Sequence, residues 1–341
     1  MRITNMMMTT QYIHSLNSLT RELNRSRVQV ETGRKFSKSS ENTSAAIKAF
    51  QIRKDLSKAE GYKGNIAYAK SRLTDSESAL FHMNELMQTA YEKIDFALNG
   101  TQTNSERTII ATELRNIQDQ LFQTLNSISS DSYYFGGTNT STRPFELADG
   151  KLQYNGYPLD FPLSGDSAET NEALLDTLRN NSMFLDIGLN VEFDSATGII
   201  DGSTVFGYSI PGINIVGSGT VTVDGEKVSC NLYDLLGTII NELESDDYNY
   251  YKANDLLGHL RKMGNNIGNC ITEIGAKSSY LDFMLERTED RVFNLKEKQV
   301  DVEGIDIAEA MIDFETQKFA YIAALQMGTK VIQPTVFDYM M

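Results

Sequence analysis

Proline is confined to the middle and the far C-terminal part of this 341-residue chain. The five prolines are Pro144, Pro158, Pro162, Pro211 and Pro334. Because proline breaks the interior of an α-helix, long helices can form before residue 144 and again between residues 212 and 333. Glycine follows the same division, since 13 of the 24 glycines lie between Gly136 and Gly225. We therefore expect two helical regions on either side of a segment of strands and turns.

Both helical regions carry apolar residues at the spacing of long packed helices. A seven-residue repeat runs from Ile52 to Ile94, and alternate steps of three and four run from Leu257 to Val302. This period forms the seam along which long helices pack. We predict helices over 44–98, 104–128 and 249–302, which bury their seams on one another. The predicted bundle seam comprises Ile52, Ile66, Leu73, Leu80, Ile94, Leu260, Ile267, Ile274, Leu281 and Leu295.

Capping signals define the ends of these helices. Asn99-Gly100 is a typical helix stop. Thr103 and Glu106 form a capping box, in which the hydroxyl and the carboxylate each accept a hydrogen bond from a free backbone amide. The short loop between the first two predicted helices favours an antiparallel hairpin. Asp306 and Glu309 predict a second capping box before the last helix.

The two ends of the chain carry apolar faces of their own. The stretch 31–44 and Gly304 have the composition of joints that separate the end helices from the central bundle. Residues 1–38 hold seven basic and two acidic residues, and residues 301–341 hold two basic and seven acidic residues. These opposed charges favour pairing of the ends, although both faces could equally be solvated helix surfaces. The apolar residues of the two faces are Tyr12, Leu16, Leu19, Leu23, Val30, Ile307, Met311, Phe314, Tyr321, Leu325 and Ile332.

The middle segment has turn dipeptides at close intervals. Those that suit hairpins are Asp149-Gly150, Asn155-Gly156, Asp201-Gly202, Pro211-Gly212 and Asp224-Gly225. We expect strands in the runs LNVEF (189–193), TVFGYSI (204–210), INIV (213–216) and TVTV (220–223). Short helices are expected over 169–180 and 231–243.

These patterns divide the chain into three parts. Residues 1–38 and 303–341 are predicted to form a terminal coiled-coil-like domain. Residues 39–144 and 232–302 form a discontinuous helical bundle, and residues 145–231 form a β-rich insertion. The predicted fold is mainly α: a long antiparallel helical bundle built from N- and C-terminal segments, with a small β-rich inserted domain.

Composition and spacing argue against several function classes. The chain has 31 basic and 46 acidic residues, a net charge of −15, which is unfavourable for binding nucleic acid. No apolar run is long enough for a transmembrane helix. The N-terminal residues lack the apolar core and cleavage site of a conventional secretory signal.

Residues with catalytic or metal-binding chemistry are scattered. His82 and His259 each have a carboxylate within about one helical turn, which is far more often a surface pair than a catalytic one. Cys230 and Cys270 form neither a disulfide framework nor a zinc motif. Gly136-Gly137 predicts a turn rather than a phosphate cradle. We expect no catalytic site, no metal site and no cofactor.

Five short stretches match a known family pattern. They are Met1–Thr4, Thr32–Lys35, Phe96–Thr101, Ser132–Phe145 (SYYFGGTNTSTRPF) and Asp301–Pro334. Together they resemble the bacterial flagellin-like axial proteins, and within them the hook-associated branch. The resemblance covers roughly 1–145 and 245–341. Ser40–Thr43 departs from the family pattern, which commonly has a proline there. We therefore expect the geometry of the N-terminal joint to differ from that of the family.

The resemblance implies a structural protein of the bacterial flagellum, a junction (adaptor) subunit between hook and filament. It implies a ring of copies whose neighbours are hook-associated protein 1 and flagellin, with a flagellar export chaperone in the cytoplasm. It also implies type III export without a cleaved signal peptide, an extracellular location and no membrane insertion. The eleven apolar residues of the end helices would then be the subunit-assembly residues, and Met6–Met8 would add a hydrophobic assembly face.

Two alternatives stay open at this point. Flagellin, the bulk filament subunit, shares the end helices and the bundle. A cytoplasmic coiled-coil scaffold would explain the heptads, but it would not explain the joints or the paired patterns at the ends.

Overall fold

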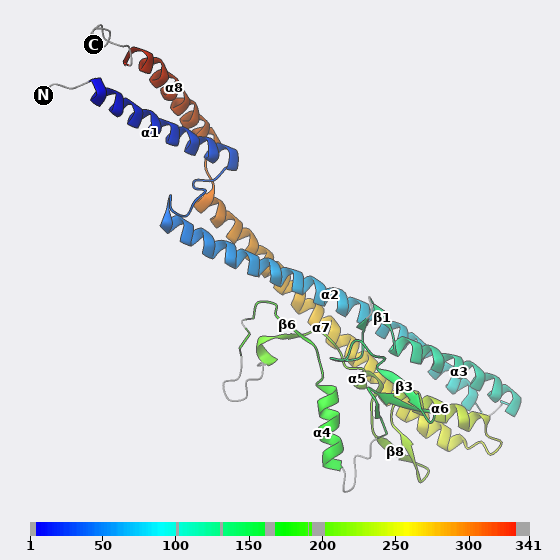
Figure 1. Cartoon of the computed structure of the whole chain (residues 1–341). Helices are drawn as coiled ribbons and strands as arrows, with labels where there is room; N and C mark the ends of the chain where they lie inside the picture. Colours follow the sequence, from blue (N-terminus) through cyan, green and yellow to red (C-terminus); the bar gives the residue numbers. More distant parts are fainter. Residues whose placement is uncertain are drawn as a thin grey trace. The chain divides into compact units, whose positions relative to one another are not determined.

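Helices dominate the computed structural model of the chain, which describes residues 5–99, 102–129, 132–160, 168–189, 191–192 and 202–331 (Figure 1). The helices are α1 Asn5–Thr32, α2 Thr43–Leu98, α3 Asn104–Leu125, α4 Ala168–Arg179, α5 Ile213–Val216, α6 Leu232–Glu244, α7 Tyr250–Glu303 and α8 Ile307–Val331. The strands are β1 Ile128–Ser129, β2 Ser132–Tyr133, β3 Phe145–Ala148, β4 Lys151–Tyr154, β5 Tyr157–Pro158, β6 Phe184–Leu185, β7 Phe206–Gly207, β8 Thr220–Val223 and β9 Glu226–Ser229. The prediction of a mainly α fold with a small β-rich insertion is confirmed.

The chain divides into two compact units. One contains residues 1–61 and 288–341, and the other contains residues 62–287. Helices α2 and α7 contribute to both, so each unit combines residues from the two halves of the sequence. The division into three parts made from the sequence places its boundaries elsewhere and stays a prediction.

In the unit 62–287, α2 and α7 run antiparallel. Lys70 of α2 pairs with Asp282 of α7, whereas Asp95 of α2 pairs with Arg261 of α7 over 2.5 Å. Residue numbers therefore rise along one helix as they fall along the other. The hydroxyl of Tyr91 adds a contact to the carbonyl oxygen of Leu260 at 3.4 Å.

The predicted bundle seam follows the packed side of these two helices. Two of its members are half-buried and lie in the unit 1–61 and 288–341, namely Ile52 and Leu295. The other eight are buried in the unit 62–287: Ile66, Leu73, Leu80, Ile94, Leu260, Ile267, Ile274 and Leu281. A continuous core of this kind stabilises a long helix pair through apolar burial.

Helix α3 begins at the predicted capping box and packs on α6. The backbone amide and hydroxyl of Thr103 both donate to the Glu106 carboxylate, and the Thr103 side chain accepts from the Glu106 amide. The helix ends at Leu125 rather than at the expected residue 128. The cause is Asn126, whose side chain bonds both the amide and the carbonyl of Phe145 and so draws the chain towards β3.

The insertion is built from hairpins whose turns the sequence identified. Asp149-Gly150, Asn155-Gly156 and Asp224-Gly225 connect β3 to β4, β4 to β5, and β8 to β9. Both residues of each turn have positive φ, the left-handed geometry that Asp, Asn and Gly favour. Asp201 lies outside the described residues. Helix α4 also confirms the expected helix at 169–180.

Three strand predictions in the insertion were wrong or only partly right. The run 213–216 is a single helical turn, α5, which follows Pro211-Gly212 in place of the expected hairpin. Its apolar residues are buried, and a short apolar run has no period that separates a buried strand from a buried helix. Of the run 204–210, only Phe206–Gly207 is a strand, and Val191 and Glu192 are not in a strand.

Two smaller predictions concern turns and caps. Gly136-Gly137 does form a turn, in which the amide of Asn139 donates to the Gly136 carbonyl. Asp306 caps α8 by accepting from the amides of Ala308 and Glu309. In the described residues, the reciprocal bond from the Asp306 amide to the Glu309 side chain is missing, so the second capping box is half made.

Candidate assembly surface

The two end helices, α1 and α8, pack against each other within the unit 1–61 and 288–341. The predicted residues of α1 are all half-buried: Tyr12, Leu16, Leu19, Leu23 and Val30. Steps of three, four and seven residues place them along one side of the helix. Among the side chains that the structure describes in α1, none is fully buried. The contact with α8 is therefore shallow.

A hydrogen bond and a glycine fix the pairing of α1 with the last turns of α8. The Tyr12 hydroxyl donates to the carbonyl oxygen of Ala324 over 2.9 Å. Gly328 is buried next to the same ring, and a Cβ built on it would lie 2.1 Å from the Tyr12 hydroxyl oxygen. The absence of a side chain at residue 328 thus leaves the space that the tyrosine occupies.

The predicted residues of α8 are less covered than those of α1. Phe314 and Tyr321 are half-buried, but Ile307, Met311 and Leu325 are exposed. Ile332, the last predicted residue, lies outside the described residues. The single chain therefore leaves much of the predicted apolar face uncovered.

A second apolar stripe on α8 was missed from the sequence. Ile312, Phe319, Ile322 and Met327 are all exposed, and Phe319 has 75% of its surface accessible. Steps of seven and three from Ile312 to Ile322 were the available signal for a second apolar side. A helix that is apolar on several sides is normally surrounded by other protein in its working state.

The connector between α1 and α2 contacts the connector between α7 and α8. They form an isolated antiparallel bridge, in which the amide of Lys35 donates to the Glu303 carbonyl over 2.7 Å. In return, the amide of Ile305 donates to the Gly33 carbonyl over 3.2 Å. Gly33 has φ +67°, the left-handed geometry with which glycine ends a helix. Both stretches that the sequence marked as joints thus meet at one point.

A buried carboxylate holds this joint to α2. Glu303 is only 4% exposed, and its Oε2 accepts a hydrogen bond from Arg53 Nη2 over 2.6 Å. Arg34 Nε lies 3.9 Å from the same oxygen, and the hydrogen bond with Glu303 raises the pKa of Arg53. Within the described part of the chain, Glu303 Oε1 has no hydrogen-bond partner. The two arginines offset much of the cost of burying this charge.

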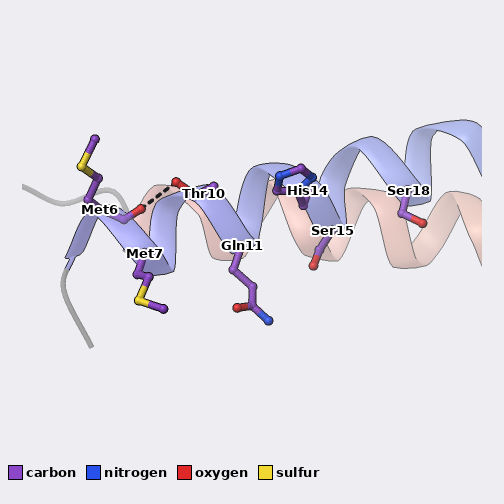
Figure 2. Close-up of a pocket in the computed structure, with 7 residues that line it drawn as sticks. All are labelled: Met6, Met7, Thr10, Gln11, His14, Ser15 and Ser18. Atoms are coloured by element: carbon purple, nitrogen blue, oxygen red, sulfur yellow. Dashed lines mark hydrogen bonds between the residues drawn. The ribbon is translucent and has the colours of Figure 1, made fainter. Parts of the chain in front are cut away.

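The first turns of α1 present an open surface of mixed polarity (Figure 2). Met6 is 82% exposed, and Met7 and Met8 are also exposed. Thr10 donates its hydroxyl to the Met6 carbonyl, and His14 lies further along the helix. Flexible, exposed methionines suit contact with another apolar surface.

The histidines and cysteines considered in the sequence lie scattered along the chain. His82 is exposed and His259 is half-buried. Burial raises the pKa of the Cys270 thiol to about 11 and also raises that of Cys230, which disfavours the reactive thiolate. Among the described residues, no group of three or more His, Cys, Asp or Glu side chains could hold a metal ion. Nor does any helix in this part of the chain have the length and apolarity needed to cross a membrane.

Comparisons of the sequence and of the fold with known proteins both find flagellar proteins. A family model for the bacterial flagellin N-terminal helical region matches residues 3–140. Flagellar hook-associated protein 3 of Salmonella typhimurium is 26% identical over 348 residues, which cover 99% of each protein. This chain is similar to flagellar hook-associated protein 3 along its whole length. The resemblance to the hook-associated branch is therefore confirmed.

Solved structures share the fold at lower identity. A candidate flagellar hook-associated protein from Vibrio parahaemolyticus superposes with a TM-score of 0.60 at 19% identity, covering 77% of this chain and 100% of that one. The flagellar junction protein FlgL from Legionella pneumophila gives 0.51 at 14% identity, covering 75% and 99%. These two structures thus share the arrangement of the elements with this chain.

Proposed function

We propose that this protein is a structural subunit of the bacterial flagellum, which joins the hook to the filament and assembles through α1 and α8 with neighbouring axial subunits. The whole-length similarity to flagellar hook-associated protein 3 supports the place in the flagellum. The uncovered apolar sides of α8 support the mode of assembly. In this proposal the eleven predicted residues from Tyr12 to Ile332 contact neighbouring subunits, and residues 1–38 and 303–341 act as one assembly domain.

The observation that carries the proposal is the difference in burial between the two units. The unit 62–287 has a continuous core of fully buried side chains, whereas α1 and α8 cover each other only in part. Ordering a residue costs roughly 1–2 kcal/mol, and buried apolar area returns about 25 cal/mol per Å². A shallow two-helix contact therefore gains little net stability in one chain. Neighbouring copies that cover Phe319 and Ile322 would supply the missing burial.

The specific partners follow from the same proposal. They are further copies in a ring, hook-associated protein 1 on one side, flagellin on the other, and an export chaperone before assembly. We further propose secretion by the flagellar type III route without cleavage of a signal peptide, and no enzymatic activity. The acidic composition is unfavourable for nucleic acid. The mass of the secreted chain tests the export route.

A substitution on the uncovered stripe tests the assembly mode. Phe319→Ser removes an exposed ring, so the stability of the single chain should change by less than about 0.5 kcal/mol. Incorporation into flagella and motility should nevertheless fall at least tenfold. Tyr251→Ser in the unit 62–287 is the matched control, because Tyr251 is 82% exposed and is not on an end helix. Normal incorporation of the Phe319→Ser protein would contradict the proposal.

Truncation tests the same idea on the whole domain. Deletion of 1–38 or of 303–341 should abolish incorporation, while a 44–302 fragment keeps its helical content and a cooperative melt. If a truncated chain is incorporated normally, the end helices are not the assembly domain.

Flagellin is the second candidate, because the family model that matches residues 3–140 is described as a flagellin region. Copy number separates the two functions. A junction subunit should be found in few copies at one collar, whereas flagellin should be found along the whole filament. Labelling of the intact organelle in the electron microscope gives the answer.

A further inference from the structure

A basic hollow of about 260 Å³ lies between α1 and the connector that follows it. Of the residues that line it, four are basic, namely Arg21, Arg25, Arg34 and Lys38, and one is acidic, Glu41. In a chain with a net charge of −15, this is an unusual local concentration of cations.

The cations of this hollow are largely without carboxylate partners in the single chain. Glu41 bonds the amide of Ser37 over 3.0 Å. Arg34 reaches Glu303 only at 3.9 Å, and Arg21 Nε donates to a backbone carbonyl of its own helix. In the part of the chain that the structure describes, Arg25 and Lys38 form no ion pair. The hollow therefore keeps a net positive charge open to solvent.

A complementary acidic surface lies on α8 of the same unit. Glu309 and Asp313 are exposed, and across the described residues neither forms an ion pair. Asp306, which caps the helix, lies one turn before Glu309 on the same side. Although α1 and α8 pack together, no described residue of α8 lines the hollow, and within the described residues no ion pair joins the hollow to Glu309 or Asp313.

The spacing of the two charged surfaces is the same. Arg21 and Arg25 are four residues apart on α1, and Glu309 and Asp313 are four residues apart on α8. Residues at this spacing project from one side of a helix with about 5–6 Å between their Cβ atoms. The two helix faces can therefore pair charge with charge along one line of contact.

We propose that the basic hollow of one copy receives the acidic first turns of α8 from a second copy. The inference rests on the proposed function and specifies its interface: apolar stripes supply the burial, and this charge pairing sets which faces meet. Because the two surfaces differ and lie on one molecule, the contact is head-to-tail and generates a ring or a helical array rather than a closed dimer. Such pairing mainly determines specificity and association rate, and salt weakens it.

Zero-length carbodiimide coupling of the full-length chain tests the contact. The reagent joins a lysine amine to a carboxylate in direct contact, so it should link Lys38 to Glu309 or Asp313. Mixing ¹⁴N and ¹⁵N chains distinguishes links between copies from links within one copy. We expect links between copies, reduced at least fivefold in 0.5 M NaCl.

Charge reversal makes the test directional. Variant one is Arg21→Glu/Arg25→Glu, and variant two is Glu309→Arg/Asp313→Arg. Variant one alone should lose the link at least tenfold, because its two surfaces then have the same sign. Variant two has no carboxylate at 309 or 313 to couple, so it serves in the mixture as the chain with the parent hollow. In an equimolar mixture the link should return, and only from Lys38 of variant two to α8 of variant one. Lys54→Glu/Lys58→Glu, on α2 of the same unit, is the matched control and should link as the parent does.

The inference is overturned by the absence of a link between parent chains, by links only within one chain, or by a link that variant one alone retains. A mixture that fails to restore the link also overturns it. Inorganic phosphate at 10 mM should compete no better than chloride of equal ionic strength; if phosphate alone removes the link, the hollow is an anion site instead. Normal flagellar incorporation without any Lys38 link would reject this interface and leave the proposed function standing.

Discussion

Gly264 on α7 lies against the ring of Tyr91 on α2, and an alanine there tests the packing of the unit 62–287. A Cβ built on Gly264 would lie 1.8 Å from the Tyr91 hydroxyl oxygen and 3.1 Å from Cζ of the same ring. Ordinary contact begins near 3.4 Å, so the hydroxyl must move by roughly 1.5 Å. That movement also strains the contact of the hydroxyl with the Leu260 carbonyl.

Two opposing terms set the size of the effect. Alanine is better than glycine in a helix interior by about 0.8–1.0 kcal/mol. Overpacking of a well-packed contact costs about 1–3 kcal/mol. The difference between these two terms leaves a decrease of up to about 2 kcal/mol in the free energy of unfolding of the Gly264→Ala protein. With Tyr91→Phe in the same chain, the atom at 1.8 Å is gone, and the alanine should be neutral or stabilising.

Urea titration of the full chain, followed by hydrogen exchange of α7 peptides, measures this free energy for the unit that contains Gly264. The double-mutant cycle with Tyr91→Phe should give an interaction energy of about 1–3 kcal/mol, the overpacking cost that the phenylalanine removes. Gly258→Ala is the matched control, because no atom lies within 4 Å of a Cβ built on this α7 glycine. If Gly264→Ala is as stabilising as Gly258→Ala, or if Tyr91→Phe does not change its effect, then the Tyr91 hydroxyl does not occupy the space next to Gly264.

Three further predictions concern other parts of the chain. Thr103→Ala removes half of the α3 capping box and should cost about 1 kcal/mol in urea unfolding. Gly328→Ala displaces Tyr12 and should lower hydrogen-exchange protection of α1 about tenfold, with no change in the unit 62–287. Burial raises the pKa of Tyr91 to about 12, so its neutral form is favoured in the folded state; stability should fall as the pH rises from about 10 to 12, and Tyr91→Phe should flatten that decline. A decline of equal slope in the Tyr91→Phe protein would contradict the assignment.

The long helices were predictable because their constraint is local in sequence. A repeat of 3.5 residues, a capping box at Thr103 and the absence of proline are each read directly from neighbouring residues. They gave the bounds of α2 and α7 to within one residue of the structure. The hairpins at Asp149-Gly150 and Asp224-Gly225 were predictable for the same reason, since a two-residue turn requires particular residues.

The insertion was harder because its elements depend on partners far away in sequence. The run 213–216 turns into a helix where Gly212 lies against the Phe145 ring, so close that a Cβ would be 2.5 Å from it. Helix α3 ends early because Asn126 bonds the backbone of Phe145. Neither contact leaves a periodic signal, and both override local preference.

The end helices differ from both cases, because a search for one apolar stripe finds one face of a helix and passes over a second. It therefore left out Ile312 and Phe319 on α8, which are exposed in the single chain. If the folding unit is an array of copies, each end helix needs several apolar sides. The sequence of α8 meets that requirement, whereas a helix at the surface of a bundle needs only one apolar side. The charges follow the same logic: Arg25 and Glu309 lack ion-pair partners within the described residues, as a surface completed by another copy would. Exposed apolar side chains and unpaired charges on α1 and α8 are therefore what we expect of a subunit whose stable state is the assembly.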